Sequence, residues 1–121
     1  MRTLVITGMG KEKAERLACD VAGDQFTVKT ASDYEGIVAL TTGQADYYLG
    51  ICQSGAGGAL ALAIGMLGSA KCTTVSTLGK PPAPDAIESA VREGKVAYGA
   101  AFDHIEQVVP RLVRAIDQSG P

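Results

Sequence analysis

The sequence predicts an α/β fold, a three-layer, doubly wound sheet of five parallel strands with helices on both faces. Two observations predict the class: short apolar, β-branched runs alternate five times with helical patterns, and glycine follows most of these segments. A third, the length of 121 residues, suits a single α/β domain over residues 1–121. Because strands that alternate with helices pair in parallel, we expect the strand order 2-1-3-4-5.

The first half of the chain predicts two strand–helix pairs. The strands are residues 2–7 (RTLVIT), which end at Gly8, and residues 25–30 (QFTVKT). Ser32 and Glu35 have the spacing of a capping box, so the second helix should begin there and end at Gly43. The first helix, from Lys11 to Gly23, has apolar residues at helical spacing: Ala14, Leu17, Ala18 and Val21.

The third pair is the most unusual. Residues 46–53 (DYYLGICQ) predict a strand, and residues 56–67 (AGGALALAIGML) predict a helix that is apolar on every face. A helix without a polar face is normally buried on all sides. It should therefore lie against the sheet and also under a neighbouring element or another subunit, so we expect a homo-oligomer, a dimer or an assembly of dimers.

The second half predicts two further pairs. The strands are residues 71–77 (KCTTVST) and 95–101 (KVAYGAA). Pro84 fits the first turn of the fourth helix. Asp103 and Glu106 have capping-box spacing before the last helix, in which Pro110 predicts a kink or a later start. Apolar residues mark the inner faces of these helices: Ile87, Ala90, Val91, Ile105, Val108, Val109, Leu112, Val113 and Ile116.

The densest glycine cluster, GICQSGAGGALALAIG over residues 50–65, predicts an anion site. The first turn of a helix leaves backbone N–H groups unpaired, and the helix dipole adds positive charge there, which suits a phosphate, a carboxylate or a developing oxyanion. Cys52 would lie at the mouth of this site as a thiolate base or nucleophile, with Ser54 adding a hydroxyl. The alternative is that the glycines only allow close helix packing and that Cys52 is a small hydrophobe.

Loops after the other strands should line the same cleft, because the carboxyl ends of parallel strands meet at one edge. We predict Cys52 and Ser54 as catalytic. His104 could instead be a solvated neighbour of a helix cap, and Gly8–Lys11 (GMGK) is no P-loop. The predicted ligand-binding residues are Gly8, Gly10, Lys11, Gln53, Gly55, Ala56, Gly57, Gly58, Thr77 and His104.

Composition excludes several classes of protein. Eleven basic and 13 acidic residues give a net charge of −2 without a basic block, so no nucleic-acid partner is expected. The weakly polar run 55–70 is too short and glycine-rich to cross a membrane. Three cysteines without CxxC spacing predict neither disulfides nor a zinc site, and we expect a cytoplasmic protein without a metal or other cofactor.

The segments GQADYYLGICQSGAGGALALAI (43–64) and REGKVAYGAAFDHIEQVVPRLVRAI (92–116) resemble the family of ribose-5-phosphate isomerase B and galactose-6-phosphate isomerase. That resemblance implies an isomerase-B-like or flavodoxin-like sheet. It also implies that Cys52 moves a proton between adjacent carbons, that Ser54 helps to open the sugar ring, and that the amides of residues 55–58 hold the enediolate oxygen. The isomerases have an Asp-His pair after their first strand, where this chain has GMGK.

The segments GQADYYLGICQSGAGGALALAIGMLG (43–68) and REGKVAYGAAFDHIEQVVPRLV (92–113) are also similar to the YhfU-like family of small bacterial proteins of unknown function, which reads D-Y-Y-I-G-x-C-x-T-G-A-G and E-G-K-V-A-F-G. Two functions remain open at this point. One is a site for a small anionic, sugar-phosphate-like metabolite with aldose–ketose proton transfer by Cys52. The other is a non-catalytic subunit or interaction protein, in which the glycines serve packing and assembly.

Overall fold

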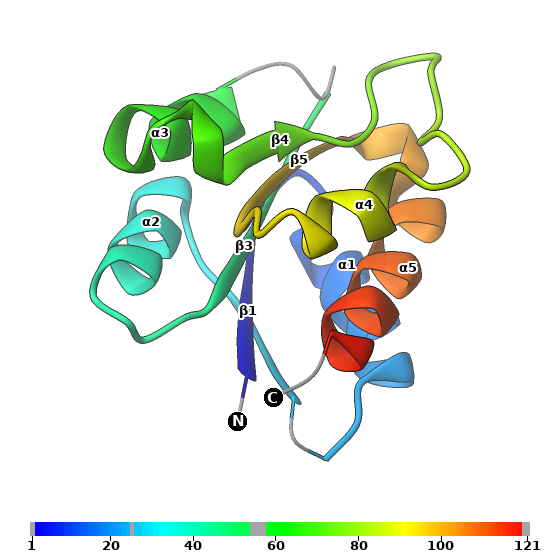
Figure 1. The fold of residues 1–121 in the computed structure, drawn as a ribbon, viewed down its shortest axis with the longest axis horizontal. Helices are drawn as coiled ribbons and strands as arrows, with labels where there is room; N and C mark the ends of the chain where they lie inside the picture. Colours follow the sequence, from blue (N-terminus) through cyan, green and yellow to red (C-terminus); the bar gives the residue numbers. More distant parts are fainter. Residues whose placement is uncertain (1, 25, 54–57, 120–121) are drawn as a thin grey trace.

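The structure is a computed structural model that describes residues 2–24, 26–53 and 58–119. Strands and helices alternate as predicted, and in Figure 1 the two ends of the chain lie at the same end of the molecule. The elements are β1 (Arg2–Gly8), α1 (Lys11–Val21), β2 (Phe26–Thr30), α2 (Asp33–Thr41), β3 (Tyr47–Cys52), α3 (Gly58–Leu67), the 3-10 turn η1 (Ser69–Lys71), β4 (Cys72–Thr74), α4 (Ala86–Arg92), β5 (Ala97–Ala101), the 3-10 turn η2 (Phe102–His104) and α5 (Ile105–Gln118).

The five strands form one parallel sheet, which confirms the predicted α/β class, in the order β2-β1-β3-β5-β4. The predicted order 2-1-3-4-5 is wrong at its last two strands. All five residues of β5 are buried, as in a strand covered on both faces. β4 has only three residues, and its Thr74 is exposed, so β4 suits the edge of the sheet.

Because β5 lies between β3 and β4, α4 lies on the face of the sheet opposite α3. Because crossovers between parallel strands are right-handed, a chain that turns back from β4 to β5 places α4 beside α5, and the two helices are in contact. The helices α1, α4 and α5 therefore cover one face, and α2 and α3 cover the other (Figure 1). The predicted order would have placed α4 beside α3.

Each face has its own apolar core. The core under α1, α4 and α5 contains large branched side chains from α4 and α5: Ile87, Val91, Ile105, Val108, Val109, Leu112, Val113 and Ile116. The core under α2 and α3 is smaller, and its buried members are Val5, Ile37, Ala45, Tyr48, Leu60, Ala63, Cys72 and Ala97. The helical stripe predicted for the last helix is thus the main support of one face.

The two predicted capping boxes have different outcomes. At the start of α2 the box is present: the Glu35 N–H donates to Ser32 Oγ at 3.2 Å, and the Ser32 N–H donates to Glu35 Oε1 at 3.3 Å. The box predicted at Asp103 and Glu106 is wrong, because the N-cap of α5 is His104. The Asp103 carboxylate instead accepts a hydrogen bond from the N–H of Gly79, 24 residues earlier in the sequence.

The later start allowed for at Pro110 and the position predicted for Pro84 are wrong, whereas the kink at Pro110 stays a prediction. α5 is continuous from Ile105 through Pro110, so its start is not delayed, and its buried stripe keeps it on the sheet. α4 begins at Ala86, so Pro84 lies in the turn before the helix and not in its first turn. The carbonyl of Pro84 accepts a hydrogen bond from Arg111 Nη2 at 3.0 Å, which holds that turn against α5.

Candidate functional site

Cys52 ends β3 at the place where the winding of the sheet reverses. β1 and β3 are neighbours, and Gly8 at the end of β1 pairs with Ile51. From β1 the chain moves to β2 on one side, whereas from β3 it moves toward β4 on the other. Ligands of doubly wound sheets bind at the carboxyl ends of the strands at such a point. Cys52 is half-buried there and pairs with Ala101 of β5.

The loop after β1 is in direct contact with the end of β3. The N–H of Met9 donates to the carbonyl of Ile51 at 2.9 Å. Gly8 has φ +96°, and a Cβ at this position would lie 1.9 Å from the Ile51 oxygen. Only glycine fits this close backbone approach. Gly8 therefore positions the loop after β1 beside Cys52.

Gly10 connects the same loop to the start of α5. It has φ +72°, and a Cβ there would lie 2.8 Å from Ile105 Cδ1 and 3.2 Å from Phe102 Cε2. The loop after β1 thus packs against the end of β3 and against the segment that follows β5. Lys11 points elsewhere: its Nζ donates to the carbonyl of Ala31, after β2, at 3.2 Å.

The loop after β4 reaches the same edge of the sheet. Thr77 and Lys80 bond each other through their backbones, at 3.2 and 2.8 Å, around a two-residue turn. The Gly79 N–H in that turn donates to Asp103 Oδ2 at 3.4 Å. Ser76, directly before this turn, has a buried Oγ that accepts a hydrogen bond from the Ala101 N–H at 3.0 Å. Thr77 therefore lies in the loop that Asp103 ties to the end of β5.

His104 is buried, with 7% of the residue exposed, so its interpretation as a solvated neighbour of a helix cap is wrong. Its Nδ1 lies 3.4 Å from Asp103 Oδ1, without the geometry of a hydrogen bond. Among the described residues, this nitrogen has no hydrogen-bond partner. A buried polar atom without a partner is costly and rare, and such atoms gather at functional sites.

Several predicted site residues cannot be compared with the structure. Ser54, Gly55, Ala56 and Gly57 lie outside the described residues, which resume at Gly58, the first residue of α3. Gln53 is exposed after β3. The described residues that the fold brings to the carboxyl edge of the sheet are Gly8, Gly10, Thr77 and His104, whereas Lys11 engages the end of β2.

Three apolar side chains at this edge were not among the residues predicted from the sequence. Met9, Leu78 and Phe102 follow β1, β4 and β5, and each is largely exposed. A large apolar residue directly after a predicted strand is the signal that could have identified them. Ser76 was also overlooked, since its role depends on a partner 25 residues away.

Other features of the described residues do not add to this site. No group of three or more His, Cys, Asp and Glu side chains there could hold a metal ion. In the described part of the chain no helix is long and apolar enough to span a membrane. A surface hollow of about 410 Å³ contains none of the predicted site residues and is lined by α1 side chains: Lys13, Glu15, Arg16, Leu17, Cys19 and Asp20. Cys72 is buried, and burial raises the pKa of its thiol, as expected of a structural cysteine.

The reversed winding and the cluster of loops at the carboxyl edge define a doubly wound α/β protein of the flavodoxin-like class. The crystal structure of ribose-5-phosphate isomerase B from Giardia lamblia has a similar fold, with a TM-score of 0.69 and 15% identity over 99% of this chain and 96% of that chain.

Sequence comparison identifies the family. Residues 2–116 match the family described as "Protein of unknown function DUF2620". The "Uncharacterized protein YhfU" of Escherichia coli (strain K12) is 33% identical over 113 residues, which cover 93% of this chain and 97% of the relative. The same protein of Shigella flexneri matches equally well. The chain therefore belongs to the DUF2620 family, and the predicted YhfU-like resemblance is confirmed.

Proposed function

We propose that this protein binds a small anionic, sugar-phosphate-like metabolite at the turn from Cys52 to Gly58 and isomerises it between aldose and ketose. The observation that carries the proposal is the place of Cys52, at the end of β3 where the winding reverses. The neighbouring fold belongs to a protein named ribose-5-phosphate isomerase B, which supports the reaction class.

The proposed chemistry is a proton transfer without net oxidation. The Cys52 sulfur removes a proton from the carbon beside the substrate carbonyl, leaving an enediolate. The same proton returns to the former carbonyl carbon, while the hydroxyl proton of the neighbouring carbon moves to the former carbonyl oxygen, so that the carbonyl forms at the neighbour. Unpaired N–H groups at the start of α3 stabilise the enediolate oxygen. His104, whose Nδ1 makes no hydrogen bond among the described residues, supplies a second polar group at this edge.

Differential thiol modification tests the site. Ribose 5-phosphate or inorganic phosphate should slow the modification of Cys52 and leave Cys19, exposed on α1, unchanged as an internal control. Cys52→Ala should abolish turnover of sugar phosphates, and Cys19→Ala should retain it. Equal modification rates with and without anion, together with a Tm that no sugar phosphate shifts, would eliminate the anion site.

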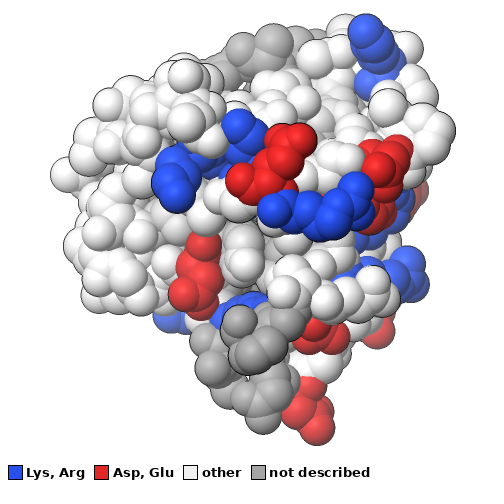
Figure 2. All heavy atoms as spheres, in the orientation of Figure 1, with Lys and Arg blue, Asp and Glu red and all other residues white. Residues whose placement is uncertain are grey.

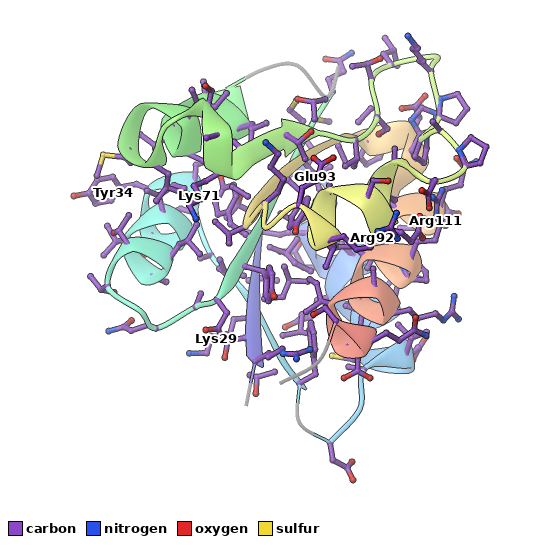
Figure 3. The ribbon with its side chains drawn as sticks, in the orientation of Figure 1. Lys29, Tyr34, Lys71, Arg92, Glu93 and Arg111 are labelled. Atoms are coloured by element: carbon purple, nitrogen blue, oxygen red, sulfur yellow. The ribbon has the colours of Figure 1, made fainter. Side chains whose placement is uncertain are left out.

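We also propose that the face formed by α2 and α3 binds a second copy of the chain. From Tyr47 to Ala70 the sequence contains no charged residue. In Figure 2 the surface over α3 is white, with charged side chains gathered over α4. Two copies of the uncharged α3 surface can meet about a two-fold axis without like-charge repulsion. Large apolar side chains are exposed on it: Tyr34, Val38, Ile64 and Met66. Figure 3 shows Tyr34 at the outer edge of this layer.

Small residues on α3 favour the same interpretation. Ala61 and Gly65 are exposed one turn apart, and a Cβ at Gly65 would meet no atom within 4 Å. No contact with a described residue therefore requires glycine at this position. A partner helix that approaches closely would require it.

This surface supports the second candidate function, that of a non-catalytic subunit. On that interpretation assembly is the role of α3, and the glycines serve close packing. Sedimentation velocity combined with the anion-binding assay separates the two functions. An assembly that Ile64→Lys dissociates, in a protein that binds no sugar phosphate, would favour the non-catalytic subunit.

The cytoplasmic location stays a prediction.

A further inference from the structure

Asp103 and His104 lie directly after β5, the strand that pairs with the end of β3. His104 is the only histidine in the chain, and its side chain is 8% exposed. Its Nδ1 is buried, makes no hydrogen bond among the described residues, and lies 3.4 Å from Asp103 Oδ1. A buried nitrogen without a hydrogen bond is costly, and a catalytic role is one of the reasons for which native structures keep such a group.

The carboxylate of Asp103 is held by a second loop. Its Oδ2 accepts a hydrogen bond from the N–H of Gly79 at 3.4 Å, in the turn that the backbones of Thr77 and Lys80 close. Oδ1 therefore faces the histidine, whereas Oδ2 is occupied by a backbone donor. An ionised carboxylate only accepts hydrogen bonds, so it favours the imidazole tautomer in which Nδ1 carries the proton.

A proton on Nδ1 leaves the lone pair of Nε2 for a ligand. This is the arrangement of a general base that a carboxylate orients. The separation of 3.4 Å is longer than a hydrogen bond, but such contacts are often long before substrate binds and tighten afterwards. A capping role does not explain the side chain, because His104 makes no side-chain hydrogen bond to the start of α5.

The register of the sheet sets the distance between His104 and Cys52. Cys52 pairs with Ala101, and neighbouring strands lie about 4.8 Å apart. His104 follows Ala101 by three residues in η2, and a 3-10 turn rises about 2 Å per residue, so the backbone of His104 lies about 6 Å farther along. A separation of this size can be spanned by one small substrate.

The proposed isomerisation needs a second acid–base group. Cys52 moves the carbon-bound proton, but the hydroxyl proton of the neighbouring carbon must also reach the former carbonyl oxygen. Imidazole both takes and gives a proton near neutral pH, so it suits this transfer. Two other ionisable side chains near this edge are engaged: Lys11 Nζ donates to the Ala31 carbonyl, and Glu35 closes the cap of α2.

We propose that His104, oriented by Asp103, carries the hydroxyl proton between the two oxygens of the substrate. Nε2 accepts the proton from the hydroxyl on the carbon that Cys52 has deprotonated, so His104 becomes an imidazolium. Nε2 then donates this proton to the former carbonyl oxygen, and the imidazole is neutral again. The inference rests on the proposed isomerisation and adds its second proton carrier, with Asp103 as a positioning residue.

The single histidine makes its tautomer directly measurable. Long-range proton–nitrogen NMR spectra, recorded where the imidazole is neutral, should show the proton on Nδ1 in the wild-type protein. Asp103→Asn should reverse the tautomer: the amide oxygen stays on the Gly79 N–H, and the amide NH₂ then faces Nδ1 and requires an acceptor there. Asp20→Asn, at an exposed aspartate of α1, is the matched control and should change nothing.

Isotope exchange separates the two proton carriers. With ribose 5-phosphate in heavy water, His104→Gln should slow isomerisation about 100-fold, as expected for the loss of a general acid–base group. Exchange of the substrate's carbon-bound hydrogen for deuterium should continue, because Cys52 performs that step, whereas Cys52→Ala should lose both reactions. Asp103→Asn should lower kcat with little change in KM. Thermal unfolding establishes that each variant folds, and the tautomer of the wild-type protein tests the inference without any variant.

Each outcome has a defined meaning. The Nδ1 tautomer, together with exchange that continues in His104→Gln while isomerisation is lost, supports the inference. A proton on Nε2 in the wild-type protein, or a tautomer that Asp103→Asn leaves unchanged, overturns it whatever the activity. Full isomerisation by His104→Gln also overturns it, and the proposed function then stands. If the wild-type protein neither isomerises sugar phosphates nor exchanges their hydrogen, the proposed function fails, and the proton transfer assigned to His104 fails with it.

Discussion

The two helical layers of this protein differ in how completely their apolar side chains are buried within one subunit. Under α1, α4 and α5, large branched side chains such as Leu112 and Ile116 are almost fully buried. Under α2 and α3 the core is smaller, and Ile64 and Met66 on α3 remain 41% and 58% exposed. The first layer is complete within the subunit, whereas the second leaves an apolar outer surface.

The layers also differ in how charge is used. At the surface of the layer formed by α1, α4 and α5, Arg111 pairs with Glu88. Arg111 Nη2 donates to Glu88 Oε1 at 2.8 Å, and Arg111 Nε donates to Glu88 Oε2 at 3.2 Å. Figure 3 places Arg92 and Arg111 where α4 meets α5. α3 carries no charged side chain that could form such a tie. The comparison indicates that one layer stabilises the subunit and that the other is suited to assembly.

The largest expected effect comes from truncating the same residue type in each core. Leu112→Ala should lower the free energy of unfolding by about 2–5 kcal/mol, because it leaves a cavity among rigid neighbours. Leu60→Ala should cost roughly half as much, since the smaller core under α3 can relax more easily. Urea unfolding measures both, with Leu78→Ala as the exposed control. An equal cost for the two core variants would contradict the difference between the layers.

The second effect concerns the start of α2. Ser32→Ala should cost about 1 kcal/mol, because it removes the side-chain acceptor of the Glu35 N–H. The control is Ser119→Ala at the end of α5, whose hydroxyl donates to the Ile116 carbonyl and should matter less. If the two serine variants unfold at the same urea concentration, the cap does not stabilise the second layer.

The third effect is a pH dependence of the first layer. The hydrogen bond from Arg111 holds the pKa of Glu88 below its usual value of 4.5, so the ionised form stabilises the fold. Glu88→Gln should cost about 0.5–1 kcal/mol above pH 4.5, the range of a partly exposed ion pair. The difference from wild type should vanish as the pH falls through the lowered pKa.

Urea unfolding at several pH values measures this dependence. Glu93→Gln, on the exposed end of the same helix, is the matched control. A difference between wild type and Glu88→Gln that persists at low pH would show that the ion pair is not its cause.

The smallest effect on the isolated subunit is expected at α3. Ile64→Lys should change its free energy of unfolding by less than about 0.5 kcal/mol, because Ile64 is already partly exposed. It should nevertheless dissociate a dimer formed through this face, since two added charges would meet across the two-fold axis. Sedimentation velocity tests this, with Leu78→Lys as a control outside the face. A wild-type protein that is monomeric at micromolar concentration would contradict the proposed assembly.

How well the sequence predicted each residue of the candidate site depends on how far away in the sequence its contact partner lies. Gly8 was identified because glycine after a strand is a local signal, and a close backbone approach explains it. The role of Asp103 was misjudged, because its carboxylate bonds Gly79 and not the helix that follows it. Met9 and Phe102 were overlooked, since their exposure is decided by loops that only the fold brings together.

The sequence by itself determined the α/β class, the alternation of strands and helices, and the cap of α2. These follow from interactions within a few residues and from the periodicity of apolar side chains. Only the tertiary structure decided that β5 lies inside the sheet and β4 at its edge. The physical reason is that a central strand must be buried on both faces, and which strand is so buried depends on the helices that pack there. The face that α4 covers, and the loops that surround Cys52, follow from that choice.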